Sequence, residues 1–360
     1  MKRRKLNKKG KRTIALSSIF GFAIIIIVIF GLINNDKDNK LSNSKEIKKE
    51  EKNINKEEKI EEKKIKIIDL DSDSRPYAVM INNISNVWGY QSGIQDAYLV
   101  YEIIVEGGYT RLMAVYKDVN LDRIGSVRSS RHYFLDYALE NDAVYVHFGW
   151  SPQAESDIKS LGVNNINFLS YNGYTRDKSL NLASEHTAFT TTEDIKNGED
   201  YYNYRTTSNQ KSLLNYSADE IDLLSYNENQ VANKIYIEYS KNRSTSYEYD
   251  SENKVYKRFQ NNQEHIDYDT KNQYTAKNII IYQVSNSTIS GDDKGRQDID
   301  NIGSGEGYYI TNGYAIPITW NKSSRARQTV YKTLDGEELI VNDGNTFIQI
   351  QPKGFTLTIE

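Results

Sequence analysis

Two carboxylates in the stretch YEIIVEGGYTR are the first candidates for chemistry. Glu102 and Glu106 lie four residues apart in a run that reads as a strand, so we expect them to share one face of it. At about 3.3 Å per residue they would stand roughly 13 Å apart, whereas glycosidase pairs need about 5–5.5 Å or about 6.5–9.5 Å. They therefore do not form such a pair with each other. Glu106 stays a candidate general acid or base with another partner, and structural salt bridges are the alternative for both.

A cationic cluster follows in DRIGSVRSSRHYF. Arg123, Arg128 and Arg131 lie on a short loop that leads into an expected helix, with Ser129 or Ser130 marking its N-terminus. A helix N-terminus attracts anions, and forked guanidinium groups bind phosphate or carboxylate in two-point contacts. The sequence predicts a local anion site here, although pairing with the surplus of acidic residues would explain the arginines equally well. The candidate ligand-binding residues are Glu102, Arg111, Arg123, Arg128, Arg131 and Arg176.

Histidines are few, and none has the spacing of a zinc motif, so we expect neither a metal nor a cofactor. His147 ends an apolar run directly before a glycine, a position where α/β domains place ligand contacts. His186 and Asp177 lie in a long irregular stretch, and long loops are often functional. With Glu106 they make up the candidate catalytic residues: Glu106, His147, Asp177 and His186. For His147, a satisfied structural histidine is the alternative.

Alternating apolar runs from residue 67 onward predict the elements that would position these residues. Helices are expected over 130–140 and over 152–161, where Ser151 is a cap and Pro152 the first helical residue. Strands are expected over 77–82, 97–105, 111–118, 143–148, 165–169, 234–239, 246–249, 254–259, 277–284, 307–311, 314–320, 328–333 and 346–351. The predicted class is α+β, with an α/β-type domain over 67–210, a junction over 211–233 and a mostly β domain over 234–360.

A glycine-rich stretch, GSGEGYYITNGYAIPITW, superficially resembles a phosphate-binding loop. It lacks the Lys-Ser/Thr ending and leads into no helical pattern, so it is better read as turns between strands, with Asn312-Gly313 as a hairpin signal. Exposed aromatic rings at Tyr308, Tyr309 and Trp320 would offer a platform for a sugar, although half-buried aromatic residues are common in strands.

Charge and composition exclude several classes of protein. The chain has no cysteine, so it forms no disulfide and no thiolate site. Residues 1–66 carry 19 Lys/Arg and 9 Asp/Glu of the 46 and 49 in the whole chain, which leaves residues 67–360 with 27 basic and 40 acidic residues, a net charge of −13. So acidic a region argues against binding nucleic acid through bulk electrostatics.

The N-terminal segment predicts a membrane anchor. Residues 1–12 carry eight positive charges, and residues 13–33 form an uncharged run whose helix would span about 30 Å, the thickness of a bilayer core. No small-residue cleavage site follows. The basic flank places the N-terminus in the cytoplasm. Residues 34–66 would then form a charged stalk that carries the remaining chain outside the cytoplasm.

Several motifs together resemble the YerB-like lipoprotein family of bacterial cell envelopes. They are SRPYAVMINN, YEIIVEGGYTR, RIGSVRSSRHYF, YVHFGWSPQA, GSGEGYYITNGYAIPITW and NTFIQIQP. The resemblance implies an exported, surface-attached protein of two adjacent domains with no assigned activity. Family members typically carry a lipid-modified cysteine, which this chain replaces with the anchor. The positions within family motifs are Glu102, Glu106, Arg111, Arg123, Arg128, Arg131, His147, Ser151, Gln153, Arg176, Asp177, His186 and Thr187.

Two functions remain open at this point. The first is an envelope-tethered binding or scaffolding module for wall glycan, wall peptide or a wall-acting protein. The second is a hydrolase or transferase acting on an anionic wall polymer, with the arginines binding the anion, Glu106 or Asp177 as acid or base, and a histidine to orient it. Convergence of Glu106, His147 and His186 with the arginines in one pocket would favour the enzyme.

Overall fold

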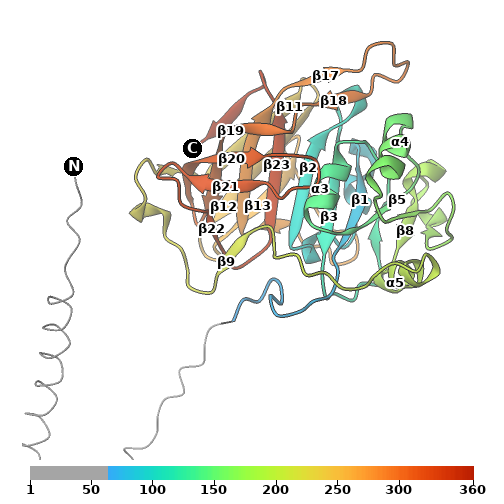
Figure 1. Cartoon of the computed structure of the whole chain (residues 1–360). Helices are drawn as coiled ribbons and strands as arrows, with labels where there is room; N and C mark the ends of the chain where they lie inside the picture. The colour runs from blue at the N-terminus through green and yellow to red at the C-terminus, as the bar shows by residue number, and fades with distance from the viewer. Residues whose placement is uncertain (1–63) are drawn as a thin grey trace, which may run out of the picture. The chain divides into compact units, whose positions relative to one another are not determined.

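Strands from both halves of the chain pair into one 11-stranded sheet (Figure 1). The computed structural model describes residues 64–360. The strands follow the order β10 (Gln230–Val231), β20 (Tyr314–Lys322), β19 (Gly303–Thr311), β16 (Asn278–Val284), β23 (Thr346–Pro352), β2 (Leu99–Ile104), β3 (Thr110–Tyr116), β1 (Tyr77–Asn83), β5 (Val144–His147) and β6 (Asn165–Asn167), and β21 (Val330–Thr333) also pairs with β20. The two halves meet where β2 pairs in parallel with β23.

The sheet is mixed, and its strand directions determine where a site can form. β1 pairs in parallel with β5, and β5 with β6, while β3 runs antiparallel between β1 and β2. β1, β2, β5 and β6 therefore share one direction, and their carboxyl ends lie at the same edge. Ligands of α/β sheets bind outside the carboxyl ends of parallel strands.

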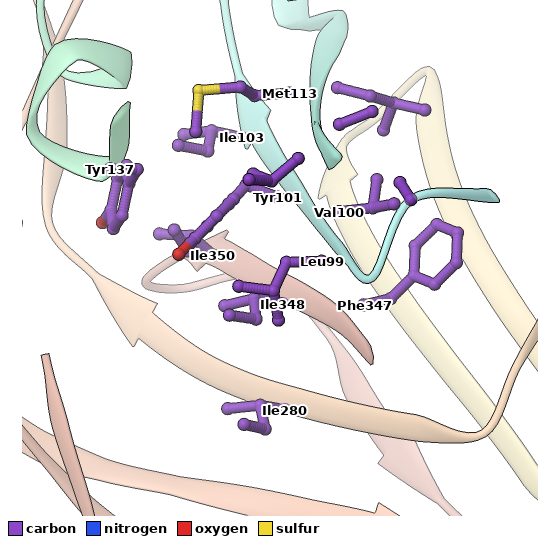
Figure 2. Packing of buried hydrophobic residues seen from close by; sticks show 14 of the residues in the cluster. Leu99, Val100, Tyr101, Ile103, Met113, Tyr137, Ile280, Phe347, Ile348 and Ile350 are labelled. Carbon is purple, nitrogen blue, oxygen red and sulfur yellow. The ribbon is translucent and has the colours of Figure 1, made fainter. Parts of the chain in front are cut away.

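A second, six-stranded sheet covers one face of the first. Its strands are β14 (Gln263–Glu264), β13 (Val255–Gln260), β12 (Arg243–Asp250), β11 (Lys234–Ser240), β24 (Leu357–Ile359) and β15 (Thr275–Ala276). Side chains alternate between the faces of a strand. Accordingly, Val100 and Phe347 lie on one side in Figure 2. The Phe347 ring contacts Tyr247 of β12 in the second sheet. Tyr101 points the other way, against Tyr137.

Within residues 64–360 there are three short α-helices: α3 (Phe134–Glu140), α4 (Pro152–Leu161) and α5 (Thr192–Tyr201). The expected start of α4 is confirmed, since the Ser151 hydroxyl accepts a hydrogen bond from the Ala154 amide and Pro152 is the first residue. The expected start of α3 is wrong. Residues 128–130 are extended and pair with Met80 and Gly149, so Ser129 and Ser130 cap no helix.

The remaining elements are short. A three-stranded sheet joins β4 (Ile124–Gly125), β8 (Ala188–Thr190) and β7 (Thr175–Arg176), and two-stranded pairs join β9 (Asn215–Ser217) to β22 (Ile340–Asn342) and β17 (Asn286–Thr288) to β18 (Gln297–Ile299). Short 3-10 segments lie at Ser85–Tyr90, Ile94–Asp96, Glu106–Gly108, Lys178–Leu180, Ser184–His186 and Leu223–Ser225. The described part of the chain is thus mostly β with mixed sheets.

Every strand expected from the sequence overlaps an observed strand. The Asn312-Gly313 turn joins β19 to β20 with φ of 51° and 82°, as a two-residue hairpin of this type requires. The predicted cytoplasmic tail (1–12), anchor (13–33) and stalk, apart from its last three residues, lie outside the described residues. Within residues 64–360, no helix is long and apolar enough to cross a membrane.

Candidate functional site

The carboxyl edge of the first sheet gathers several of the predicted residues. Asn82 lies at the end of β1, Glu106 follows β2, and Arg111 lies near the start of β3, opposite Asn82. The extended segment 126–131 passes along this edge, because the Arg128 amide bonds to Met80 of β1 and the Ser130 amide to Gly149 beyond β5. Backbone pairing thus brings together residues that are distant in sequence.

Glu106 and Arg131 form a two-point ion pair in this edge. The Arg131 Nε donates to Glu106 Oε2 at 2.9 Å and a second guanidinium nitrogen donates to Oε1. Arg111 approaches the same carboxylate at 3.4 Å and also donates to the Ser129 carbonyl. Burial alone would raise the pKa of Glu106, but the hydrogen bonds of Arg131 and the charges of both arginines lower it to about 2. Glu106 is therefore a carboxylate, not an acid, at neutral pH.

Arg128, Glu185 and His186 form a second group beside the first. Arg128 Nη2 donates to Glu185 Oε1 at 3.0 Å. His186 Nδ1 lies 3.0 Å from Asn82 Nδ2, and its Nε2 lies 3.5 Å from Glu185 Oε1. Burial and the nearby Arg128 charge lower the pKa of His186, which keeps the imidazole neutral at neutral pH. Asn82 Oδ1 is buried and has no hydrogen-bond partner among the described residues.

Arg111, Arg128 and Arg131 make up what we call the arginine cluster. Burial lowers the pKa of Arg111 to about 9, and the charges of Arg131 and Arg128 contribute to this. The acidic ion-pair partners of the cluster among residues 64–360 are Glu106 and Glu185. Three positive charges face two negative ones, so the cluster keeps a net charge of +1 in an otherwise acidic protein.

His147 does not join the cluster. Its side chain is fully buried, with Nδ1 2.8 Å from the Gly149 carbonyl and Nε2 3.0 Å from Asn165 Oδ1. Its ring packs against Tyr145 and Trp150. Burial lowers the pKa of His147 to about 4. The residue therefore supports the chain that leaves β5, and its two nitrogens are engaged by the protein itself.

Outside the arginine cluster, Arg123 pairs with Asp177, and Arg176 packs on an aromatic ring. Arg123 Nη2 binds Asp177 Oδ2 at 2.9 Å and its guanidinium covers the Phe189 ring at 3.6 Å. Hydrogen bonds from Ser179, then the Arg123 bond, lower the pKa of Asp177. Arg176 lies over Phe148 at 4.7 Å. The predicted catalytic residues thus separate into three environments instead of one constellation.

Glu102 does not share a face with Glu106, so this expectation is wrong. β2 ends at Ile104, and the turn at Glu106–Gly108 carries Glu106 toward Arg131, while Glu102 points to the second sheet. There the fully buried Glu102 accepts bonds from Arg243 Nη2 at 2.9 Å and Arg258 Nη2 at 2.7 Å. Burial opposes ionisation, but these two charges lower its pKa to about 2. Glu102 joins the two sheets.

Two further expectations concern sugars and metals. Tyr309 and Trp320 are buried, with relative exposures of 0% and 5%, so the three aromatic residues do not form an exposed platform. Within residues 64–360, no group of three or more His, Cys, Asp or Glu side chains is placed to hold a metal ion.

The fold and the arginine cluster define a class of protein: mostly β proteins in which one mixed sheet, built from both halves of the chain, carries buried arginines at its carboxyl edge.

Residues 66–205 match the family described as "Protein of unknown function (DUF3048) N-terminal domain", and residues 235–348 match its C-terminal domain. A relative in Bacillus subtilis (strain 168), named "Putative lipoprotein YerB", is 28% identical over 287 residues, which cover 78% of this chain and 82% of the relative. The crystal structure of the YerB protein from Bacillus subtilis superposes with a TM-score of 0.69 at 27% identity, over 80% of this chain and 94% of that chain. This chain belongs to the YerB-like family.

Proposed function

We propose that this chain is an extracytoplasmic protein of the bacterial cell envelope whose arginine cluster binds an anionic ligand. The lipoprotein name of its Bacillus relative supports the location. The basic N-terminus and the apolar run over 13–33 support a single-pass anchor with the N-terminus in the cytoplasm. The ligand is a carboxylate or phosphate group of wall glycan or peptide, or of a wall-acting protein, and not nucleic acid.

The uncompensated charge of the arginine cluster carries this proposal. Arg111 and Arg131 are each 6% exposed, and burying like charges together is unfavourable without a compensating anion. The lowered pKa of Arg111 has the same origin. Arg128 is more exposed than Arg111 and Arg131, and its partner Glu185 is exposed as well. An anion would therefore reach the arginine cluster from the side of Arg128. A bound anion would bring the net charge of the site to zero.

An enzyme acting on an anionic polymer has weaker support. Glu106 is held by two arginines and its pKa of about 2 removes it as a general acid. His147 is enclosed, and Asp177 pairs with Arg123. His186 also adjoins the arginine cluster, through Glu185, and it would need a reacting group from the ligand to act on.

Anion binding by the full chain, purified in a non-ionic detergent, tests the proposal. Inorganic phosphate and N-acetylmuramic acid would be titrated by calorimetry into wild type, Arg128→Gln and Arg123→Gln. The two arginines are a matched pair, because their side chains are 23% and 24% exposed and each has an acidic partner. We expect Arg128→Gln to weaken binding about tenfold, as loss of a charge-assisted bond does, and Arg123→Gln to leave it unchanged.

Isolated wall sacculi extend the same experiment to the natural ligand. Retention of the chain on sacculi without release of soluble fragments supports a binding module. Fragment release that Arg128→Gln abolishes would instead establish an enzyme. Equal anion binding by wild type and Arg128→Gln would exclude the arginine cluster as the site.

A further inference from the structure

An open strand edge lies at one side of the second sheet. Among the strands of residues 64–360, β24 pairs with β11 alone, so its other edge has no partner strand. The backbones of Lys234 and Glu360 exchange both hydrogen bonds of their pair. Because hydrogen-bonded residues alternate along an antiparallel pair, the amide and carbonyl groups of Leu357 and Ile359 point away from β11. Such an edge is a template for an added strand.

A groove of about 450 Å³ adjoins this edge. Its apolar lining consists of Ile281 of β16, Tyr308 of β19, Pro317 of β20, Leu334 after β21 and Leu357 of β24. Tyr308 is paired with Ile281 and with Pro317, so these three side chains share one face of the first sheet. Figure 1 marks the C-terminus, which follows β24, close to β19 and β20. The groove therefore lies on the face that the second sheet covers, just beyond the last strand of that sheet.

The groove has the position of a further strand of the second sheet. Gln283 of β16 donates to the Phe355 carbonyl at 3.4 Å, which places the start of β24 over β16. A strand paired with β24 would lie about 4.8 Å further on, over β19, and every second side chain would point into the groove. Tyr308 and Pro317 are half-buried and Leu334 is 50% exposed. Apolar surface is thus left for a partner to cover.

The charges of the groove indicate the chemistry of that partner. Glu228 and Glu306 belong to the lining, which contains no basic side chain. Both carboxylates are exposed, and neither has an ion-pair or hydrogen-bond partner within residues 64–360. Glu306 lies two residues before Tyr308 on β19, roughly 7 Å along the same face. An added strand repeats at the same interval, so a residue two positions from an apolar side chain over Tyr308 would reach Glu306.

We propose that the β24 edge and this groove bind an extended segment of a partner protein, in which an apolar residue has lysine or arginine two positions away. Strand addition of this kind draws affinity from backbone hydrogen bonds and specificity from alternate side chains. A second copy of this chain fits less well. If it paired through the same edge, its own first sheet would overlap β19 and β20, which continue beneath the groove. The site does not depend on the arginine cluster.

Fluorescence anisotropy of dye-labelled peptides, titrated with the full chain in non-ionic detergent, tests the proposal. The probe is the peptide TKTITKT, in which a lysine on each side of the isoleucine lets either chain direction present one to Glu306. The peptide TETITET is its charge-reversed control. Two further versions of the probe carry backbone N-methyl groups, one on the isoleucine and the lysines and the other on the threonines. A strand edge uses the amides of alternate residues, so these two versions should differ.

Three variants of the chain complete the experiment. Glu306→Gln removes a carboxylate of the groove. Glu264→Gln is its matched control, since it removes an exposed carboxylate from β14, at the opposite edge of the second sheet. Ile359→Pro removes one of the free amides of β24, and an edge strand tolerates proline where the amide faces solvent. Unfolding temperatures show whether each variant is folded, and the N-methylated peptides test the edge without any change to the chain.

We expect TKTITKT to bind with a Kd below about 1 mM, and TETITET and one N-methylated version to bind about tenfold more weakly. Glu306→Gln and Ile359→Pro should each weaken binding about threefold, whereas Glu264→Gln and Arg128→Gln should leave it unchanged. No binding of TKTITKT would overturn the proposal, as would equal binding of the two N-methylated versions or wild-type affinity in Glu306→Gln. A dimer seen by light scattering that Ile359→Pro abolishes would also overturn it, because a second copy would then occupy the edge.

Discussion

Glu102 and Arg258 form an ion pair between the two sheets, with Oε2 and Nη2 2.7 Å apart and both side chains fully buried. Arg243 binds the other oxygen of the same carboxylate at 2.9 Å. One acidic residue from the first half of the chain thus holds two arginines from the second half. Removing one partner of a buried pair leaves the remaining charge without compensation, which costs far more than the pair contributes.

Replacing Glu102 should therefore destabilise the protein strongly. We expect Glu102→Gln to lower the free energy of unfolding by roughly 3–5 kcal/mol, because two buried guanidinium groups lose their counter-charge. Urea unfolding of the full chain in non-ionic detergent, followed by tryptophan fluorescence, measures this. Glu248→Gln is the control: its pair with Lys234 is exposed, so the loss should stay below about 1 kcal/mol. Equal losses in the two variants would contradict the prediction.

Acidification below pH 6.5 should weaken the fold, and His147 should contribute to this together with His186 and His265, whose pKa values burial also lowers. Burial lowers the pKa of this residue from 6.5 to about 4, so between these values the unfolded chain binds a proton that the folded chain does not. The contribution of His147 to stability is complete above pH 6.5 and falls as the pH drops toward 4. A difference of this size is worth roughly 3 kcal/mol.

The free energy of unfolding, measured from pH 7 to pH 4, checks this. The slope with pH should decrease in His147→Gln. The control His132→Gln replaces a histidine that is paired with Asp298, at 3.0 Å, near the surface. A slope that His147→Gln leaves unchanged would show that other groups control the acid response.

Neutralising Glu106 should separate a binding site from an enzyme. In an anion-binding module, Glu106 competes with the ligand for Arg131 and Arg111, so Glu106→Gln should tighten phosphate binding by about tenfold. In an enzyme that uses Glu106 as a base, the same change would abolish turnover. Calorimetry with phosphate gives the first quantity and fragment release from sacculi the second. Glu185→Gln, at an exposed carboxylate, should have a smaller effect on binding.

The sequence predicted most strands and the arginines of the site, because both depend on local pattern. It could not pair Glu102 with Arg243 and Arg258, which lie 141 and 156 residues further along the chain. No local signal connects them; only the packing of two sheets does. The sequence also could not predict that His147 and His186 lie in separate environments, since this depends on how β5 and the chain after it are buried.

Helix α5 was missed for a different reason. Its sequence, TEDIKNGEDY, is polar and has a glycine in the middle, which weakens a helix by about 1 kcal/mol relative to alanine. In the structure, a Cβ at Gly198 would lie 2.7 Å from Ile166 and 3.2 Å from Tyr171. The glycine allows the helix to approach these side chains closely. Tertiary packing therefore explains why a glycine occurs inside this helix, and helix propensity does not take such packing into account.

The hairpin between β19 and β20 allows backbone strain to be measured apart from steric overlap. Gly313 has a φ of 82°, and an added Cβ would lie 2.9 Å from the Tyr249 ring. Gly336 has a similar φ of 87°, but its Cβ would meet no described atom within 4 Å. Gly336→Ala should therefore cost only the conformational term, about 1–2 kcal/mol. Gly313→Ala should cost more, by about 1–3 kcal/mol, because the Tyr249 side chain must also move. Urea unfolding of both variants gives the two free energies, and a Gly313→Ala loss no greater than that of Gly336→Ala would show that Tyr249 moves aside freely.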